Sequence, residues 1–454
     1  MLNKKEMKEL IELALRVSSA EQTEIVIHEF DSALTRFANN YIHQNVYEGN
    51  TVVSVRAIFG KKIGAASTNS LLPQKIKETV KWAERIARYQ VENTKFVSLI
   101  KTLPKQYHPV SPRVRYYASI TPQKRAEAVR DIIEVAKKHG LTAFGSVSNG
   151  WSTITIGNSL GTFAYYKSGD VFCNIVMSGK DSTGYVQAGA KSLNELNFVK
   201  LAEVAAKKAI KSADPIEIEP KSYTTIFEPL AVADFMDYLA VYAFNGKAFE
   251  EGRSYLAGRL GTKIVDERIT IVDDPFNIKG FPFPFDFEGI PKNKLVLIEK
   301  GVAQNVVYDS LTAASVGKKT TGHALTYPNP FGPIPLHLVM NRGDTEIDDI
   351  ISNTKKGILV TRLHYTNVID PYRIVFTGMT RDGTFLIEDG TITKGIKNLR
   401  FTENLFEVLN RVESISKNLE LVAREPGYGS RFSQGTIVPT IKIRDFTFTS
   451  KTQY

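Results

Sequence analysis

The spacing of hydrophobic residues near the start of the chain changes from helical to strand-like and back to helical. Apolar residues recur every three or four positions at Met7, Leu10, Ile11, Ala14 and Val17, which predicts an amphipathic helix over residues 4–18. Strands are expected in TEIVIHEF, TRFANNYIHQN, NTVVSVRAIF and KKIGAAST, with turns at Gly49-Asn50 and Gly60. A second helix is expected to begin near Pro73.

The same order of elements recurs about 118 residues further on. Thr121 and Pro122 are typical of the start of a helix, and Gly140 is typical of its end. Strands are expected in WSTITIGN, GTFAYYKS, DVFCNIVMSG and GYVQAGAKS, with breaks at Asn158, Gly169 and Gly184. A last helix is expected from about Leu193 to Ile210. We infer a duplicated helix-strands-helix unit, although the two copies share little residue identity.

Two proline-containing segments divide the chain further. A loop with Pro104, Pro109 and Pro112 joins the two similar halves, and ADPIEIEPKS, residues 213–222, is typical of an interdomain linker. We therefore expect an N-terminal α+β domain over residues 1–215, with halves at about 1–95 and 115–215, and a C-terminal domain over 223–454.

The C-terminal part is expected to be β-rich, and the whole protein to have the α+β class. Short strands are indicated by ITIVDD, KLVLIEKG, LHLVM, GILVTRL, YRIVFTG, GTFLIEDG and PTIKIRDFTF. Helices are expected near residues 229–244, 344–355 and 403–416. This alternation favours an antiparallel sheet in the C-terminal domain.

Length and charge change this picture little. The chain has 454 residues, more than the roughly 250 to 300 at which one hydrophobic core stops growing. No apolar run reaches the roughly 18 to 20 residues that a membrane span needs, and the charged N-terminus is unlike a signal peptide, so we expect a cytoplasmic protein without a membrane partner. The net charge of +10 permits nucleic-acid binding, but the lysines are scattered, so we do not expect it.

Few single residues indicate a catalytic or metal-binding function. The one cysteine, Cys173, lies in an apolar strand and is expected in the core, so neither a disulfide nor a thiolate cluster can form within the chain. None of the seven histidines has a partner at metal-ligand spacing. Asp273 and Asp274 could lend carboxylates to a metal together with His323, but Asp-Asp-Pro after a strand is more typical of a turn.

Four ordered segments together resemble the TldD/PmbA family of peptidase-related proteins, in which a TldD-type subunit pairs with a PmbA-type subunit, also called TldE. The segments are TRFANNYIHQN, SYLAGRLGTKI with ITIVDDP, NRGDTEIDDIISNTKKGILVTRL, and FTGMTRDGTFLIEDGTITKGIKNLRFTENLFEVL. The resemblance extends over nearly the whole chain. It implies a zinc metallopeptidase complex that acts on peptides or unfolded polypeptide.

The resemblance also implies which subunit this is. TldD-type subunits carry a His-Glu-x-x-x-His helix ahead of a Gly-Arg-Leu-Gly segment, here residues 258–261, and a cysteine near the C-terminus. Aligned on that segment, Asp237, Tyr238 and Tyr242 stand at the motif positions, and AREPGYGS, residues 423–430, has no cysteine. Zinc hydrolysis needs about three protein ligands and a carboxylate base.

The chain is therefore similar to the PmbA/TldE branch. This implies a subunit that binds no metal and is inactive alone, with zinc in a TldD-type partner. A heterodimer with that partner or a homodimer is expected. The family's older description, modulator of DNA gyrase, leaves an interaction protein as an alternative function. A stand-alone hydrolase with an Asp273, Asp274 and His323 metal site is a further alternative.

Two interpretations of TRFANNYIHQN remain open. In the first, Asn39 and Asn40 turn the backbone, while Arg36, His43 and Gln44 satisfy buried polar groups. In the second, the alternate residues Arg36, Asn40 and Gln44 face a shared cavity and contact a peptide.

Two other segments allow a structural and a functional interpretation. DYLAVYAF is expected to pack a helix into the C-terminal core, but Tyr238 and Tyr242 could instead line a remnant of the zinc cleft. His323 lies in the loop KKTTGHA, which is either a surface turn or a contact with substrate or with the partner's active site.

Overall fold

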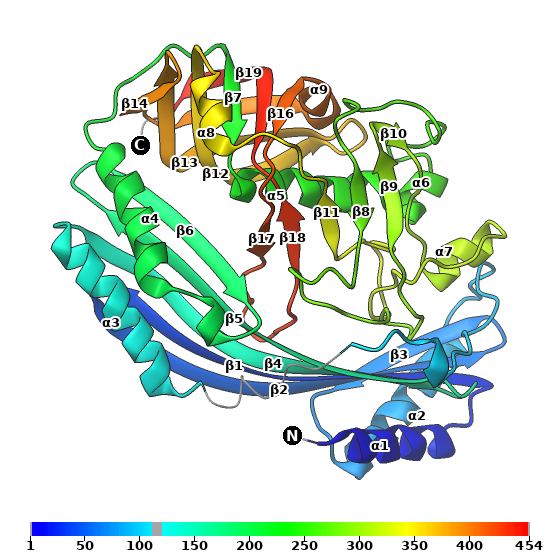
Figure 1. The fold of residues 1–454 in the computed structure, drawn as a ribbon. Coiled ribbons are helices and arrows are strands. Elements are labelled where there is room, and N and C mark those ends of the chain that lie inside the picture. The colour runs from blue at the N-terminus through cyan, green and yellow to red at the C-terminus, as the bar shows by residue number, and fades with distance from the viewer. Residues whose placement is uncertain (1, 111–119, 453–454) are drawn as a thin grey trace.

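The structure is a computed structural model that describes residues 2–110 and 120–452. Its N-terminal part contains one six-stranded sheet with the order β3-β2-β1-β4-β5-β6 (Figure 1). All neighbouring strands in this sheet are antiparallel. The strands are β1 (Gln22–Ala38), β2 (Tyr41–Phe59), β3 (Lys62–Thr68), β4 (Thr142–Asn158), β5 (Phe163–Ser178) and β6 (Thr183–Ala190).

The predicted duplication of the helix-strands-helix unit is confirmed. The helices are α1 (Lys4–Val17) and α2 (Pro73–Tyr89) in the first copy, and α3 (Pro122–Lys138) and α4 (Phe198–Lys211) in the second. The copies meet where β1 pairs with β4, so the strand order on one side of this pair mirrors the order on the other. Of the loop prolines, Pro112 lies outside the described residues.

Alternation along β1 separates the two faces of the sheet. Ile25 and Ile27 pack with α1 and α2, and Phe37 packs with α3 and α4. Val26 points the other way and packs with Phe283 and Phe285 of the C-terminal part. The four helices therefore cover one face, while the C-terminal part covers the concave face (Figure 1).

The expected turns at Gly49-Asn50 and Gly169 are wrong, since both positions lie inside strands, whereas the interpretation that Asn39 and Asn40 turn the backbone is confirmed. The hairpin between β1 and β2 turns at Asn39 and Asn40, with φ of 53° and 62°, whereas β2 continues through the expected turn at Gly49 and Asn50. A two-residue hairpin of this kind needs positive φ at both central residues, which asparagine tolerates. Likewise β5 continues through Gly169 because a glycine inside a strand does not by itself end it.

The last N-terminal helix also begins later than expected. A short 3₁₀ turn occupies Leu193–Glu195, and α4 begins only at Phe198. The side chain of Asn197 accepts a hydrogen bond from the backbone N–H of Lys200, which fixes the start of the helix there. Cys173 is buried between this sheet and its helices, as predicted.

The C-terminal part contains a small barrel. Strands β12-β7-β19-β15-β13 follow one another, and β12 also pairs with β13, which closes the ring. β14 and β16 pair at its margins. The strands are β7 (Ser222–Phe227), β12 (Lys356–Asp370), β13 (Val375–Glu388), β14 (Thr391–Gly395), β15 (Leu399–Asn404), β16 (Val412–Ile415) and β19 (Ile441–Lys451).

A second C-terminal sheet of six short strands lies beside the barrel in the order β10-β9-β8-β11-β18-β17 (Figure 1). The strands are β8 (Ile271–Asp273), β9 (Leu295–Glu299), β10 (Val302–Ala303), β11 (Leu338–Met340), β17 (Glu420–Ala423) and β18 (Gly435–Val438). The α+β class is thus confirmed. Most strand pairs are antiparallel as expected, but β7 with β12 and β11 with β18 are parallel.

Three C-terminal helices lie near the expected positions, and two short ones, α6 (Gly246–Glu250) and α7 (Ser310–Ser315), were not expected. The three expected helices are α5 (Pro229–Tyr238), α8 (Ile347–Ser352) and α9 (Leu405–Asn410). A π-helical turn, η4 (Leu239–Ala243), continues α5. The two expected strands YRIVFTG and GTFLIEDG are one strand, β13, because positive φ at Asp382 and Gly383 bends it without ending it.

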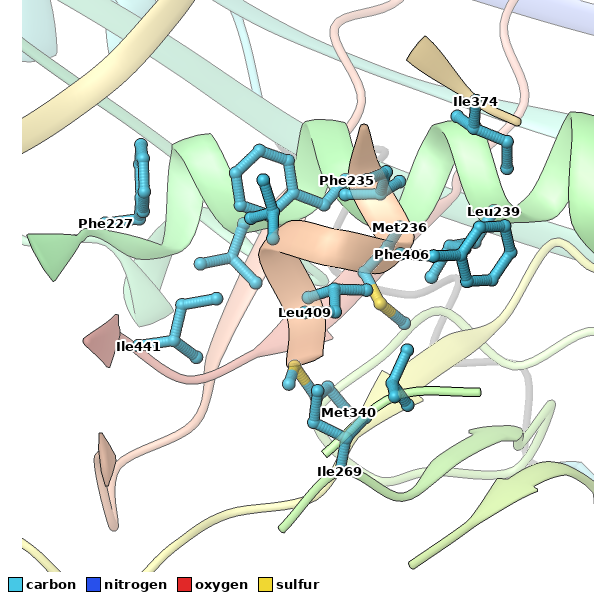
Figure 2. Packing of buried hydrophobic residues seen from close by; sticks show 14 of the residues in the cluster. Phe227, Phe235, Met236, Leu239, Ile269, Met340, Ile374, Phe406, Leu409 and Ile441 are labelled. Atoms are coloured by element: carbon cyan, nitrogen blue, oxygen red, sulfur yellow. The ribbon is translucent and has the colours of Figure 1, made fainter. Parts of the chain in front are cut away.

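The main C-terminal core packs around α5. Phe235 and Met236 of α5 and Leu239 of η4 pack with Phe406 and Leu409 of α9 (Figure 2). This packing fixes the rotation of α5 about its axis and therefore decides which of its side chains face away from the core. Within the described ranges, no helix is long and apolar enough to cross a lipid bilayer.

Glycines in β3 and β6 allow the close approach of a helix in both copies of the unit. A Cβ atom on Gly184 would lie 2.1 Å from the Ala205 carbonyl oxygen of α4, and one on Gly64 would lie 2.2 Å from the Ala83 carbonyl oxygen of α2. We predict that Gly184→Ala lowers the free energy of unfolding by about 1–3 kcal/mol because the helix must move outward. Urea denaturation measures this change.

Gly427→Ala is the matched control, because a Cβ atom there would meet no atom within 4 Å. Equal stability of the two variants would contradict the close packing of α4 on β6.

Candidate functional site

A cavity of about 590 Å³ lies between the concave face of the N-terminal sheet and the C-terminal part. Its wall is assembled from distant parts of the chain: β1, β6, α5, β12, the segment around Leu325–Leu338, and residues 422–436 around β17 and β18. The wall combines apolar side chains with charged ones. Such mixed cavities at a boundary between structural units are typical of binding sites.

Helix α5 supplies the charged centre of the wall. Pro229 begins the helix after Glu228, where proline is well tolerated. Phe235 and Met236 point into the core (Figure 2), so that Leu230, Asp234 and Asp237, spaced by four and three residues, face the cavity. The fold of α5 therefore directs two carboxyl groups to the same space.

Asp237 is paired with an arginine from the opposite wall. Nη2 of Arg424 donates a hydrogen bond to Asp237 Oδ2 over 2.7 Å. The backbone N–H of Arg424 donates to the Gln434 carbonyl, which holds the residue at the end of the pair β17–β18. The segment at which the resemblance placed the absent cysteine thus lies directly beside the helix at which it placed the absent histidines.

Arg362 of β12, the other arginine in the wall, also has its own carboxylate. Its Nε donates to Asp382 Oδ2 over 2.7 Å, and its guanidinium lies 4.2 Å from the centre of the Tyr185 ring. Asp382 further accepts a hydrogen bond from the hydroxyl of Thr183. This arginine is therefore held in place by a carboxylate outside the cavity and by an aromatic face.

Asp234 is the carboxyl group left without such a partner. Within the described residues it accepts no hydrogen bond, although Arg362 and Arg424 lie near enough to affect it. Burial and the neighbouring Asp237 raise the pKa of Asp234 to about 7, and the two arginines only partly oppose this. At neutral pH the group is therefore poised between its two protonation states.

The concave face of the N-terminal sheet contributes His28 and, close to the cavity, Arg36. Nε2 of His28 hydrogen-bonds the Arg431 carbonyl, and burial lowers the pKa of His28. Arg36 lies 5.5 Å from the centre of the Tyr428 ring. Burial raises the pKa of Glu425, which lines the cavity, and the charge of Arg36 opposes that effect.

The TRFANNYIHQN residues have several different surroundings. Asn40 forms the hairpin turn with Asn39, and its side chain bonds the backbone of Leu141 and Ala143, so it joins the two copies of the helix-strands-helix unit. His43 and Gln44 are exposed and do not satisfy buried polar groups. Arg36, Asn40 and Gln44 are not among the described residues that form the cavity wall.

Tyr238 and Tyr242 belong to the core side of α5 and η4. Their rings lie 6.4 Å apart, and the Tyr238 ring lies 5.7 Å from that of Phe376 in the barrel. Neither is among the described residues that line the cavity, in contrast to Asp237. The expectation that this segment packs a helix into the C-terminal core is confirmed.

His323 lies in a second, fully buried polar cluster. Its Nε2 donates to Asp273 Oδ2 over 3.0 Å, and its Nδ1 bonds the hydroxyl of Thr321. Nζ of Lys292 lies 3.6 Å from the same Asp273 oxygen. Burial alone would raise the pKa of Asp273, but Lys292 and His323 outweigh burial and lower that pKa below its ordinary value.

This cluster is not the metal site considered from the sequence. Asp274 does not join it: its carboxylate accepts from the backbone N–H of Phe276 and lies 3.8 Å from Lys294. The position beside Asp273 that a cation would take is occupied by the Lys292 ammonium group. Nor is His323 part of a surface turn, since its side chain is completely buried.

The residues of the cavity do not fit a zinc ion either. Zinc in hydrolases is typically held by about three ligands drawn from histidine, cysteine and carboxylates. The face of α5 toward the cavity offers two carboxylates, one of which is bonded to Arg424. Within residues 2–110 and 120–452, no group of three or more histidine, cysteine, aspartate or glutamate side chains is arranged to hold a metal.

Arg431 fixes the cavity wall to the N-terminal sheet. Its fully buried guanidinium donates to both carboxylate oxygens and the carbonyl of Asp170, and to the hydroxyl of Ser32. Ser433 also donates to the Asp170 carboxylate. These bonds hold residues 431–433 against β1 and β5, so the wall residues on either side are held in place.

Comparison with protein families agrees with this architecture. The model described as PmbA/TldA metallopeptidase domain 1 matches residues 23–87, the central-domain model matches 115–213, and the C-terminal-domain model matches 220–450. The chain belongs to this family.

Individual relatives are distant from this chain in sequence. "Metalloprotease PmbA" of Escherichia coli O157:H7 is 21% identical over 440 residues, or 92% of each chain. A "Metalloprotease" of Methanothermobacter thermautotrophicus is 26% identical over 283 residues, and this match spans only 59% of each chain. "Metalloprotease TldD homolog" of Haemophilus influenzae is 24% identical over 413 residues, 85% of this chain and 83% of that one.

Two solved structures share the whole fold. TldE from Thermococcus kodakarensis has a TM-score of 0.87 at 24% identity, over 98% of this chain and 100% of that one. A putative modulator of a DNA gyrase from Thermotoga maritima has a TM-score of 0.83 at 19% identity, with the same coverage.

Sequence reasoning missed Asp234, Arg362 and Arg424. Two acids at a helical spacing of three, on the face opposite Phe235 and Met236, would have marked Asp234 and Asp237 as a pair facing away from the core. The arginines had no such signal, because they reach the cavity from positions more than a hundred residues away along the chain.

We predict that Arg431→Met lowers the free energy of unfolding by about 3–5 kcal/mol because it leaves the Asp170 carboxylate buried without its cation. Urea denaturation of the purified variant gives the value. Arg424→Met is the control in the same segment: its ion pair with Asp237 is about half exposed, so its loss changes stability by about 1 kcal/mol or less. Equal effects of both substitutions would contradict the anchoring role of Arg431.

We also predict that Asp234→Asn stabilises the protein at alkaline pH. Since folding raises the pKa of Asp234 to about 7, stability from its protonated form is fully present below about pH 4 and is lost as the pH rises toward 7. The variant lacks this loss, so its Tm should exceed that of the wild type at about pH 8.5, with a smaller or no excess at about pH 5. The groups that face Asp234 are Asp237, Tyr238, Arg362 and Arg424, and they are unchanged in both proteins. A Tm difference that does not depend on pH would contradict the prediction.

Proposed function

We propose that this chain is the non-catalytic, PmbA/TldE-type subunit of a TldD/TldE-type zinc metallopeptidase that processes peptides and unfolded polypeptides. Its role is to complete the cavity in which a TldD-type partner cleaves the substrate. The observation that carries the proposal is the pair Asp237–Arg424, which stands where the resemblance places the zinc ligands. The likeness of the whole fold to TldE from Thermococcus kodakarensis supports it.

The chemistry of this pair supports a subunit without its own metal. An arginine cannot coordinate zinc, because its guanidinium stays protonated at any pH at which a protein folds. In this chain Arg424 also donates a hydrogen bond to one carboxylate oxygen of Asp237, so that oxygen is not available to a metal. The other described residues of the cavity wall hold and orient a substrate and shield it from water. None of them is an activated nucleophile.

The shape of the cavity supports a peptide as substrate. A peptide side chain can lie against the apolar residues of the wall, such as Leu230, Val241 and Leu336. Gln187, Gln434 and the backbone beside β17 and β18 can exchange hydrogen bonds with an extended main chain, which needs little sequence specificity. Arg36 of β1 lies directly opposite Gln44 of β2, so their side chains share one face of the sheet. We propose both as contacts for a longer substrate.

The division into domains at residues 1–215 and 223–454 belongs to the same proposal. The cavity between the two parts would then change shape if they moved relative to each other. Gyrase modulation has less support, because the cavity wall carries the carboxylates Asp234, Asp237 and Glu425 against two arginines, and DNA requires an excess of cations.

The test is to measure zinc content and peptide cleavage of the purified chain, alone and after mixing with a TldD-type subunit. We expect no bound zinc and no cleavage alone, and both in a complex with one copy of each subunit. Arg424→Glu, which places a like charge beside Asp237 at the cavity wall, should reduce cleavage by the complex while Asp348→Asn, on exposed α8, leaves it unchanged. Stoichiometric zinc together with cleavage by the isolated chain would disprove the proposal.

A further inference from the structure

We propose that the cavity binds a cationic group of a peptide, the ammonium or guanidinium of a lysine or arginine side chain or a free N-terminal amine, at Asp234. This inference deepens the proposed function, on which it rests for the peptide nature of the ligand. It names the residue that selects the ligand and the charge that is selected.

The balance of charges in the cavity wall carries the inference. Arg362 is bonded to Asp382, and Arg424 is bonded to Asp237, so neither cation is free to neutralise another carboxylate completely. Glu425 accepts a hydrogen bond from the side-chain amide of Asn174. Asp234 is the carboxyl group of this wall to which no described residue donates.

The surroundings of Asp234 make an incoming cation favourable. Asp234 lies on a helix whose opposite face, with Phe235 and Met236, is fixed in the core (Figure 2), and its side chain lines the cavity. Its neighbour Asp237 adds a second negative charge three residues further along the helix. A cation that replaces water here gains a charge-assisted hydrogen bond in a partly desolvated site.

The apolar part of the wall explains why a lysine or arginine side chain suits the cavity. Leu230 and Ala233 flank Asp234 on α5, and Leu336 and Leu338 line the cavity from the facing segment. The methylene groups of a long side chain can cover these surfaces while the charged end reaches the carboxylate. A metal ion would use none of this apolar surface.

The experiment measures binding of three labelled peptides to the isolated full-length chain by fluorescence anisotropy at about pH 8. All three are ten-residue peptides of glycine, serine and alanine with a C-terminal label. The first has a blocked N-terminus and one central lysine, the second has norleucine at that position, and the third has norleucine and a free N-terminus. Norleucine keeps the length of the lysine side chain without its charge.

We expect the lysine peptide or the free-amine peptide to bind about tenfold more tightly than the blocked norleucine peptide, the usual effect of one hydrogen bond to a charged group. Whichever peptide is preferred identifies the source of the cation. Asp234→Asn should abolish this preference, and Asp348→Asn, an exposed aspartate on α8, should keep it. Circular dichroism and the Tm of each variant show that it is folded.

Equal affinity of the wild type for all three peptides, no binding of any of them, or a preference that survives in Asp234→Asn would each overturn the inference. These outcomes are separate from those of the subunit experiment. A charge preference that depends on Asp234 in a chain that never activates a TldD-type partner would leave the site established and the subunit role rejected.

Discussion

The buried bond between Arg431 and Asp170 is the constraint on which the cavity depends. A charged pair removed from water is stable only if nearly all of its donors and acceptors are bonded, and here Ser32 and Ser433 complete the set. The pair joins β5 near the middle of the sequence to a segment close to the C-terminus. Because Arg431 fits against Gly150, where a Cβ atom would lie 2.7 Å from its side chain, the contact has little freedom to shift.

This anchor determines the position of residues that act elsewhere. Arg424, Glu425 and Ser430 precede Arg431 in the same segment and form one wall of the cavity. Helix α5 forms the opposite wall, and its rotation is fixed independently by Phe235 and Met236 in the core. The distance between Asp237 and Arg424 is therefore set by two rigid supports rather than by their own ion pair, which is half exposed and weak by itself.

The sequence predicted the periodic parts of this structure well and the contacts between distant parts poorly. The duplicated unit, the α+β class and the buried position of Cys173 follow from the periodicity of apolar residues, which is a local property of the chain. The interpretation that Asn39 and Asn40 turn the backbone is confirmed, whereas the turn expected at Gly49 and Asn50 is wrong, because glycine is also tolerated inside a long strand. His323 appeared to be a candidate ligand because Lys292, which lies beside the same Asp273 oxygen, is distant in sequence and belongs to no motif. Only the fold shows that the Lys292 ammonium group lies beside Asp273, where a metal ion would otherwise bind.

Asp234 joins these observations to function. An aspartate in this position lowers stability at neutral and alkaline pH, because burial and Asp237 oppose its ionisation and no hydrogen bond compensates. Replacing it with asparagine would remove that loss without changing the packing of α5. A group that lowers the stability of the free protein but faces an open cavity is explained if its charge is neutralised by a ligand, since binding then stabilises the ionised form. The same carboxylate would repel an anionic substrate, so the cavity that Arg431 holds open selects its ligand by charge as well as by shape.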